Sequence, residues 1–447
     1  MILQKILHTA GKYPEKEAVV YGDSRLTYGA LVEKVRRRAA AVSAGIRETN
    51  VLLIRKDPQE ALLDLLALMA AGKATLFGSR QLSATDCSAL TDRFSAFSLN
   101  DETVLQPSDN EPEWKTGLLS DRFLGVLSSG TEGTPKVIWK DYQSWVSAFP
   151  HQSDIFGLDT DDRLFILDAL SYSANLNAAL HMLWLGGTVV MASLKSAAGW
   201  TLRMREERIT SVFMVPSHYR LWSGKTGTLE QMRSLVSAGE KLDIVTARQL
   251  RETCPNALLT EYYGAAELGH VSYQQNDDIL QYGYTVGKAF PGVTITLSDQ
   301  QILVESPYVS PDYRGVNTVF DLGLIEDGRL ILLGRGGRMF NRRGLNVFAE
   351  EIESCARELS FIRDVAAVGL LRDDLSHDIC LAFSCTYPGE RSSGYHRQLK
   401  DHLLHSLPQA KQPRRILECR DLPRMDSGKL DYQAIVHLFA GEEEPAF

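Results

Sequence analysis

The chain has 447 residues, more than a single hydrophobic core usually supports, so we expect at least two domains. Its formal net charge of −8 argues against binding to nucleic acid, because phosphate backbones need a basic surface. The sequence has no apolar run approaching the ~20 residues needed to span a bilayer, and it has no secretory signal. Its six cysteines show no CxxC spacing. These features are typical of a cytoplasmic protein.

Strand and helix signals alternate along most of the chain. A short strand is predicted at 18–21, and Thr27 is expected to cap a helix whose apolar residues recur at helical spacing. A buried strand at 51–54 and an apolar helix at 62–69 come next. The alternation continues to about residue 335, which predicts an α/β protein with parallel sheets and helices on both faces.

A glycine-rich segment at 334–338 interrupts this pattern, and the sequence after it is shorter and differently organised. Glycine removes most steric restriction on the backbone, so this segment suits a junction between domains. We therefore predict a large N-terminal α/β domain over 1–335 and a small α+β domain over 336–447.

The stretch Ser-Ser-Gly-Thr-Glu-Gly-Thr-Pro-Lys, residues 128–136, lies between two apolar strands. Backbone N–H groups of a glycine loop can converge on anionic oxygens, and the hydroxyl groups and Lys136 add further donors. The stretch lacks the Gly-x4-Gly-Lys-Ser/Thr order of a Walker A loop. Taken alone, it can also be an ordinary strand–turn–strand connection.

Four further elements occur in a fixed order after this stretch. They are Tyr-Tyr-Gly-Ala-Ala-Glu at 262–267, Phe-Asp-Leu-Gly at 320–323, a segment at 344–353 that begins Gly-Leu-Asn, and Leu-Pro-Arg-Met-Asp-Ser-Gly-Lys at 422–429. The ordered set resembles the adenylate-forming superfamily of acyl-CoA synthetases, peptide-synthetase adenylation domains and luciferases. At this length, the chain is similar to compact bacterial acyl- or aryl-CoA ligases.

This resemblance implies a reaction in two steps. A carboxylic acid attacks the α-phosphorus of ATP to give an acyl-adenylate and pyrophosphate, and a thiol then displaces AMP. The chain has no fused carrier domain after 422–429, so the thiol is expected to be coenzyme A or a separate acyl-carrier protein. Two alternatives to a coenzyme A ligase stay open: a stand-alone ligase that loads a carrier protein, and a weakened adenine-nucleotide-binding homologue.

The resemblance also implies a role for each domain. Residues 1–335 are expected to form the adenylation core that binds ATP and the acid. Residues 336–447 are expected to form a mobile domain that carries the catalytic lysine, Lys429. The C-terminal domains of adenylate-forming enzymes turn between the two steps, and Gly337 matches the position of their hinge.

Each matched residue takes a role from the same resemblance. Lys429 is expected to stabilise charge as the acyl–phosphate bond forms, and Glu267 to bind Mg²⁺. Contacts to ATP or to coenzyme A are expected from Ser128, Ser129, Gly130, Thr131, Gly133, Lys136, Tyr263, Gly264, Asp321, Arg335 and Gly344. Outside this context, Lys429 would be an ordinary solvent-exposed lysine and Arg335 the partner of a nearby acid.

The pocket for a small-molecule carboxylic acid is expected at positions that match the family's wall segments. These are Tyr172, Ser173, Asn175, Ser217, Ala238, Gly239 and Tyr262. Glu132, Ala266 and Asn341 depart from the family's usual residues, and these departures motivate the weakened-homologue alternative. The segment at 169–175 also departs from the family pattern, so neither an aryl nor an aliphatic acid is indicated.

Overall fold

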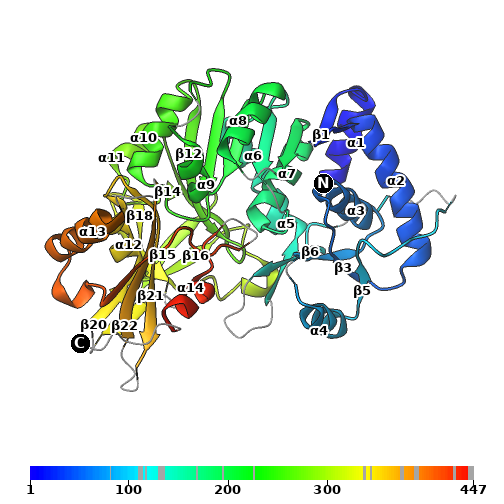
Figure 1. Cartoon of the computed structure of the whole chain (residues 1–447). Helices are drawn as coiled ribbons and strands as arrows, with labels where there is room; N and C mark the ends of the chain where they lie inside the picture. Colours follow the sequence, from blue (N-terminus) through cyan, green and yellow to red (C-terminus); the bar gives the residue numbers. More distant parts are fainter. Residues whose placement is uncertain are drawn as a thin grey trace.

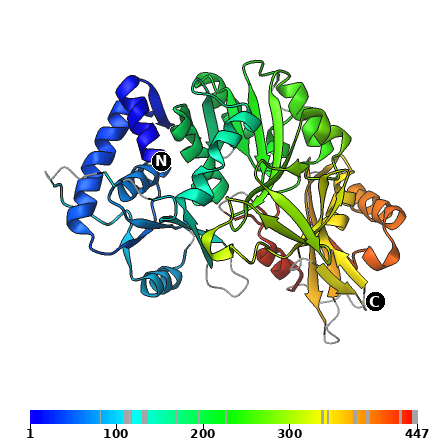
Figure 2. The same ribbon diagram turned by 180° about the vertical axis from the view of Figure 1, so that it is seen from behind.

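The computed structural model describes residues 1–80, 82–108, 114–115, 118–128, 136–167, 170–193, 196–224, 227–335, 339–342, 345–372, 377–386, 392–425 and 429–440. In both views the C-terminal elements, coloured yellow to red, lie beside the green elements and at the opposite end of the molecule from the blue N-terminal elements (Figure 1, Figure 2).

The largest sheet has nine strands, and its central strands are parallel. Antiparallel pairs flank the parallel strands at both edges. In spatial order the strands are β14 (Lys288–Ala289), β13 (Gly269–Gln275), β12 (Leu258–Ala265), β11 (Ser234–Ala238), β10 (Ser211–Met214), β8 (Arg163–Leu167), β9 (Thr188–Ala192), β1 (Glu17–Tyr21) and β2 (Ser24–Thr27).

A second sheet of five strands is parallel except for its last strand, β7. Its spatial order is β5 (Ala96–Leu99), β3 (Asn50–Leu53), β4 (Ala74–Phe77), β6 (Arg122–Ser128) and β7 (Lys136–Asp141). One hydrophobic core joins the two sheets, because it contains Val19 of β1, Leu53 of β3 and Leu180 of a helix between them. The predicted α/β architecture with parallel sheets is confirmed.

Helices connect and cover these strands. They are α1 (Ile2–Lys12), α2 (Tyr28–Gly45), α3 (Pro58–Ala70), α4 (Ala84–Phe94), α5 (Tyr142–Val146), α6 (Phe149–Phe156), α7 (Ser173–Leu185), α8 (Ala197–Glu206), α9 (Pro216–Trp222), α10 (Ile244–Thr253) and α11 (Asn276–Gln281). Thr27 caps α2 as predicted, since its side chain accepts a hydrogen bond from the Ala30 N–H at 3.2 Å.

The expected alternation of strands and helices to residue 335 is wrong in its last part. After α11 the chain forms β14 and an antiparallel sheet of β15 (Thr294–Ser298), β16 (Gln301–Glu305), β17 (Asp321–Glu326) and β18 (Arg329–Arg335), with only the short 3₁₀ helix η1 (Pro311–Tyr313) among them. Exposed and more buried residues alternate along β15 and β16, as expected for an antiparallel sheet with one solvent-facing side.

The C-terminal part of the chain has sheets and hydrophobic clusters of its own. Its elements are β19 (Met339–Arg342), β20 (Leu345–Phe348), α12 (Ala349–Arg357), β21 (Ile362–Leu371), β22 (His377–Cys385), α13 (Ser392–Ser406), η3 (Gln409–Lys411), β23 (Arg415–Glu418) and α14 (Tyr432–Ala440). Two clusters there contain only residues from 340 onward. This is consistent with the predicted boundary between 335 and 336, which stays a prediction.

Candidate active site

The carboxyl ends of the parallel strands β8, β10, β11 and β12 lie at one edge of the large sheet, where ligands of open α/β sheets usually bind. Several of the predicted site residues come directly after these strand ends. Ala238 of β11 pairs with Tyr262 of β12, and Gly239 comes directly after β11. Tyr172 precedes α7 after the end of β8. The topology therefore gathers residues from distant parts of the sequence at one edge.

Lys429 lies at this edge, against Tyr172 and Gly239. Its Nζ atom is 4.7 Å from the centre of the Tyr172 ring, which is a favourable position for a cation beside an aromatic face. Gly239 has a φ of +93°, and a Cβ atom there would lie 2.3 Å from the Tyr172 hydroxyl and 3.0 Å from Lys429 Cε. A larger residue at 239 would therefore collide with both side chains.

The segment that carries Lys429 is anchored on both sides. The Met425 N–H donates to the Lys429 carbonyl at 2.8 Å, and Arg424 and Leu430 form an antiparallel bridge. Leu422 and Leu430 are buried in a C-terminal hydrophobic cluster. These contacts anchor Lys429 to the C-terminal part of the chain, so its position depends on where that part packs.

Tyr263 and Asp321, predicted to bind the nucleoside part of ATP, are joined directly. The Tyr263 hydroxyl donates to Asp321 Oδ2 at 2.5 Å, and Asp321 is largely buried at the start of β17. Asp321 pairs in the sheet with Arg335, whose side chain lies outside what the structure describes. At Gly264 a Cβ atom would lie 2.4 Å from the carbonyl oxygen of Gly269, so glycine is required for this close approach of two strands.

Glu267, the predicted Mg²⁺ ligand, comes shortly after β12 and is half-buried. Its backbone carbonyl accepts a hydrogen bond from the Ser310 N–H at 2.8 Å, and the Ser310 hydroxyl donates to the Ala266 carbonyl. The carboxylate oxygens are hard ligands of the kind that Mg²⁺ prefers. The backbone hydrogen bonds fix the position from which the Glu267 side chain extends. Glu267 therefore fits the predicted ion.

The predicted phosphate loop is described only at its two ends. Ser128, the last residue of β6, pairs with Lys136, the first residue of β7. The Lys136 ammonium is 5.0 Å from the centre of the Tyr313 ring. Several predicted residues lie outside the part of the chain that the structure describes. In this loop they are Ser129, Gly130, Thr131, Glu132 and Gly133. The others are Gly337, predicted at the hinge, and Gly344, in the segment after it.

Some predicted pocket residues are engaged with their own surroundings. The Asn175 side chain donates to the Leu167 carbonyl at 2.9 Å, and the Ser217 hydroxyl donates to Glu240 at 3.2 Å. Ser173, the first residue of α7, is half-buried. Asn175 and Ser217 thus connect elements around the predicted pocket, whereas Tyr172 and Gly239 lie beside Lys429 and Tyr262 lines a small cavity.

An ion cluster connects the edge of the large sheet with the C-terminal part of the chain. Arg220 of α9 lies 3.2 Å from Glu240, 3.4 Å from Asp243 and 4.0 Å from Asp364 of β21. Asp364 also pairs with Arg424 at 2.6 Å. Burial by itself would raise the pKa of Asp364, but Arg424 and Arg220 hold it below its ordinary value. We call these five residues the interface ion cluster.

Lys140, which the sequence analysis did not single out, is a buried cation near this site. It is only 2% exposed and lies at the end of β7. Burial lowers the pKa of Lys140 to about 7, although Glu267 and Asp141 act in the opposite direction. The sequence contained a signal for this buried lysine, since Lys140 directly follows the apolar residues 137–139 of a predicted strand. Lysine is almost never fully buried without a charged neighbour, so such a position is unusual.

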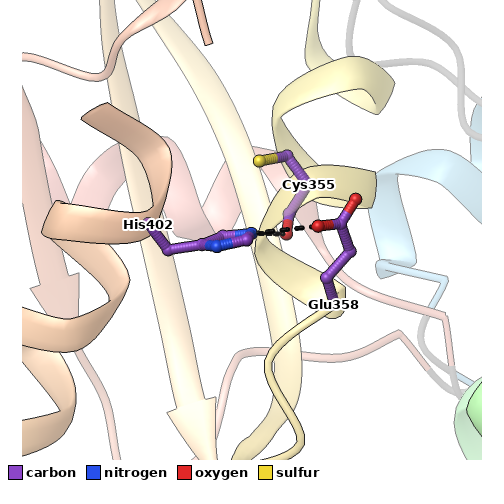
Figure 3. A group of neighbouring side chains, drawn as sticks. All are labelled: Cys355, Glu358 and His402. Atoms are coloured by element: carbon purple, nitrogen blue, oxygen red, sulfur yellow. Dashed lines mark hydrogen bonds and ion pairs between the residues drawn. The ribbon is translucent and has the colours of Figure 1, made fainter. Parts of the chain in front are cut away.

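A group of Cys355, Glu358 and His402 offers three potential metal-ligand atoms within 4.8 Å of one another (Figure 3). His402 of α13 already has polar partners there, since its Nε2 atom lies 3.0 Å from the Cys355 carbonyl and 3.1 Å from the Glu358 carboxylate. The Cys355 carbonyl belongs to the last turn of α12. The arrangement therefore links α13 to the C-terminal end of α12, apart from Lys429.

Across the described part of the chain, no helix combines the length and hydrophobicity that crossing a membrane requires.

Comparison with known proteins agrees with the motif-based resemblance. A family model described as AMP-binding enzyme matches residues 120–313. A protein from Staphylococcus epidermidis named as a putative long chain fatty acid-CoA ligase, VraA, is 22% identical over 99% of both chains. A Bacillus subtilis protein named as an uncharacterized acyl-CoA ligase, YhfT, is 26% identical over 69% of this chain and 67% of its own length.

Solved structures share the fold. The o-succinylbenzoate-CoA synthetase MenE of Bacillus subtilis, bound to its acyl-adenylate, superposes with a TM-score of 0.83 at 19% identity over 99% of both chains. The amide bond synthetase McbA of Marinactinospora thermotolerans has a TM-score of 0.81 at 18% identity, over 98% of this chain and 100% of its own. Residues 120–313 thus match the AMP-binding enzymes, and the chain as a whole has the fold of the adenylate-forming superfamily.

Proposed function

We propose that this chain is an AMP-forming acid–thiol ligase. It activates a carboxylic acid with ATP, releases pyrophosphate, and transfers the acyl group from the acyl-adenylate to a thiol, with coenzyme A as the favoured acceptor. The observation that carries the proposal is the approach of Lys429 to Tyr172 and Gly239 at the edge of the large sheet. A lysine from the far end of the chain is well placed there to bind an anion. The names of the relatives, which include acyl-CoA ligases, support the same activity.

The side chains act mainly by positioning and by neutralising charge. A carboxylate is a poor acyl donor, and its attack on a phosphoryl group brings two negatively charged groups together. Lys429 is placed to stabilise that charge, and a preorganised donor of this kind contributes roughly 10²–10³-fold to a rate. Tyr263 orients Asp321, which can then accept hydrogen bonds from a ribose. Glu267 would hold Mg²⁺, and that ion, when bound, would neutralise phosphate charge.

The C-terminal part of the chain has a role in this proposal. We propose that residues 336–447 form a separate domain that turns about Gly337 between the two steps. The separate hydrophobic clusters from residue 340 onward support this division. The interface ion cluster then belongs to the orientation that brings Lys429 to the acid.

Exchange of labelled pyrophosphate into ATP tests the first step. The assay should include aromatic, short-chain, medium-chain and long-chain acids, with AMP release measured in parallel. We expect exchange with at least one class of acid. If no acid supports exchange or AMP release, and calorimetry still detects ATP binding, the chain is a nucleotide-binding homologue and not a ligase.

Comparing acceptors tests the second step. With an accepted acid in place, coenzyme A and a phosphopantetheinyl acyl-carrier protein are offered separately, and the thioester is followed by mass spectrometry. Coenzyme A is expected to be acylated. Acylation of the carrier protein alone would show that the chain loads a carrier.

A further inference from the structure

The C-terminal part of the chain contains a group of metal-ligating side chains that the proposed function does not use. Cys355 lies in the last turn of α12 and Glu358 ends that helix, so the two residues are three positions apart and share one face. His402 of α13 meets them there. Ile352 of α12 and Leu403 of α13 belong to one buried hydrophobic cluster, which holds the two helices together. Packing therefore fixes the backbone from which all three side chains extend.

The ligand atoms of this group have a spacing close to that of a tetrahedral metal site. The Cys355 thiol, the Glu358 carboxylate and the His402 imidazole each offer one ligand atom, and these atoms lie within 4.8 Å of one another (Figure 3). His402 Nε2 is 3.1 Å from Glu358 Oε2. Bonds of about 2.0–2.3 Å to a tetrahedral ion separate neighbouring ligand atoms by roughly 3.3–3.6 Å. Nitrogen and oxygen already have nearly this spacing, and the sulfur needs an adjustment of at most about 1 Å.

The surroundings of His402 Nε2 are rich in electron-pair donors. Besides the Glu358 carboxylate, the carbonyl oxygen of Cys355 lies 3.0 Å from this nitrogen. A neutral imidazole has one N–H group, so the two oxygens compete for a single hydrogen. A metal ion at the same place would instead accept electron pairs from the ring nitrogen, the carboxylate and the thiolate together. The hydrogen bonds thus leave ligand capacity that a metal ion would use.

The position of the group at the C-terminal end of α12 also favours a cation. Carbonyl groups at a helix C-terminus carry a partial negative charge, and the Glu358 carboxylate adds a full one. Arg357, the basic residue of this turn, pairs with Glu353 at 3.3 Å. The exposed Glu358 side chain leaves a path from solvent to the buried Cys355. Burial raises the pKa of the Cys355 thiol, so the thiol keeps its proton at neutral pH until a metal displaces it.

We propose that Cys355, Glu358 and His402 bind one Zn²⁺ ion, with water or the Cys355 carbonyl as the fourth ligand. Sulfur and imidazole ligands suit Zn²⁺, whereas Mg²⁺ and Ca²⁺ prefer oxygen ligands throughout. The ion fastens the end of α12 to α13, and it is separate from the Mg²⁺ expected at Glu267. This site is independent of the ligase function, because none of its residues has a role in that function.

Cobalt spectroscopy tests the site directly. The full-length chain is purified without metal, kept reduced and titrated with Co²⁺, because a cobalt–thiolate bond gives a near-ultraviolet absorption band that oxygen ligands do not give. We expect one Co²⁺ per chain with this band, displaced by one equivalent of Zn²⁺ but not by excess Mg²⁺. Absence of the band would overturn the proposal. ATP and the acid are left out, so the result does not depend on ligase activity.

Substitution of the sulfur ligand locates the ion. Cys355→Ser should abolish the cobalt–thiolate band and weaken Zn²⁺ binding, measured by calorimetry, at least about tenfold, because even residues that only support a ligand contribute that much. Cys385→Ser is the matched control, since Cys385 Sγ also lies near a carboxylate, 3.8 Å from Glu418. Within the described part of the chain, no third ligand atom joins that pair. The control should keep the band.

Substitution of the other two ligands separates coordination from folding. His402→Gln and Glu358→Gln should each weaken Zn²⁺ binding about tenfold or more while the sulfur ligand stays in place. His396→Gln is the matched control for the histidine, since His396 Nε2 of α13 also lies near a backbone carbonyl, 3.3 Å from that of Ile416. Glu358 is exposed, so its variant is expected to fold, which circular dichroism checks for each variant. If both variants bind Zn²⁺ as tightly as the wild type, the assigned site is wrong.

Discussion

Two polar groups of the structure are stabilised in different ways: the polar floor, which consists of the buried residues Gln152, Asn177 and His270, and the interface ion cluster. The floor consists of neutral amide and imidazole groups that share hydrogen bonds, within one rigid core. The ion cluster consists of full charges, such as Arg220 and Asp364, contributed by different parts of the chain. A hydrogen-bonded neutral group suits a fixed arrangement, whereas an ion cluster between distant segments suits a contact that can open.

A neutral floor and a charged interface respond differently to opening. Neutral buried groups lose their partners when the core is disturbed, so they specify one arrangement. Charges at a contact surface regain water when the contact opens, which offsets part of the lost attraction. We therefore expect substitutions in the floor to destabilise the folded core, and substitutions in the ion cluster to change which step of the reaction is fast.

The largest effect is expected at Lys429, which lies against Tyr172 and Gly239. Lys429→Met should lower the rate of pyrophosphate exchange roughly 10²–10³-fold, because it removes the charge placed against the reacting groups. Lys411→Met is the control, since Lys411 pairs with Glu351 of α12. Equal exchange rates for Lys429→Met and wild type would show that the lysine has no part in activation.

The next largest effect is expected from Asp364→Asn. Removing one charge of a buried ion pair costs on the order of 3 kcal/mol. Here that cost would destabilise the orientation of the C-terminal part in which Lys429 lies at the site. Pyrophosphate exchange should therefore fall by about 100-fold. Transfer of the acyl group from a supplied acyl-adenylate to the thiol should stay near the wild-type rate. If both steps fall equally, the cluster stabilises the whole fold and does not select an orientation.

A smaller effect is expected from Tyr263→Phe, which removes the hydrogen bond to Asp321. The loss of one such bond is about 1–2 kcal/mol, so KM for ATP should rise about tenfold while kcat changes less. Tyr284→Phe, at an exposed tyrosine, provides the control. An unchanged KM for ATP would mean that Asp321 needs no help from Tyr263.

The last prediction concerns acid stability and His181. Burial lowers the pKa of His181 from 6.5 to about 3. Between these values the unfolded chain binds one more proton at this residue than the folded chain, so stability decreases as the pH falls. One proton corresponds to about 1.4 kcal/mol per pH unit. His181→Gln should reduce the slope of the unfolding free energy between pH 6 and pH 4 by up to this amount, as measured with urea. An identical slope would show that His181 takes no part in acid unfolding.

Much of the fold was predictable because its signals are local. The cap at Thr27 and the strand around residue 19 were placed correctly, since capping and apolar spacing involve neighbouring residues. The antiparallel sheet from Thr294 to Arg335 was missed. Parallel and antiparallel sheets both contain short apolar strands, and only the pairing of the strands in the folded protein distinguishes them. The resemblance to adenylate-forming enzymes, which rested on motif order, was confirmed.

The amino-acid sequence by itself determined the order of the motifs, the residue types available for binding ATP and an acid, and the local elements. Tertiary structure alone decided that Lys429 meets Tyr172 and Gly239, and that Gln152 contacts Asn177 and His270 in the core. No local sequence pattern predicts either contact. Both depend on which distant segments pack together, and burial changes the energy of a polar group only after that packing is complete.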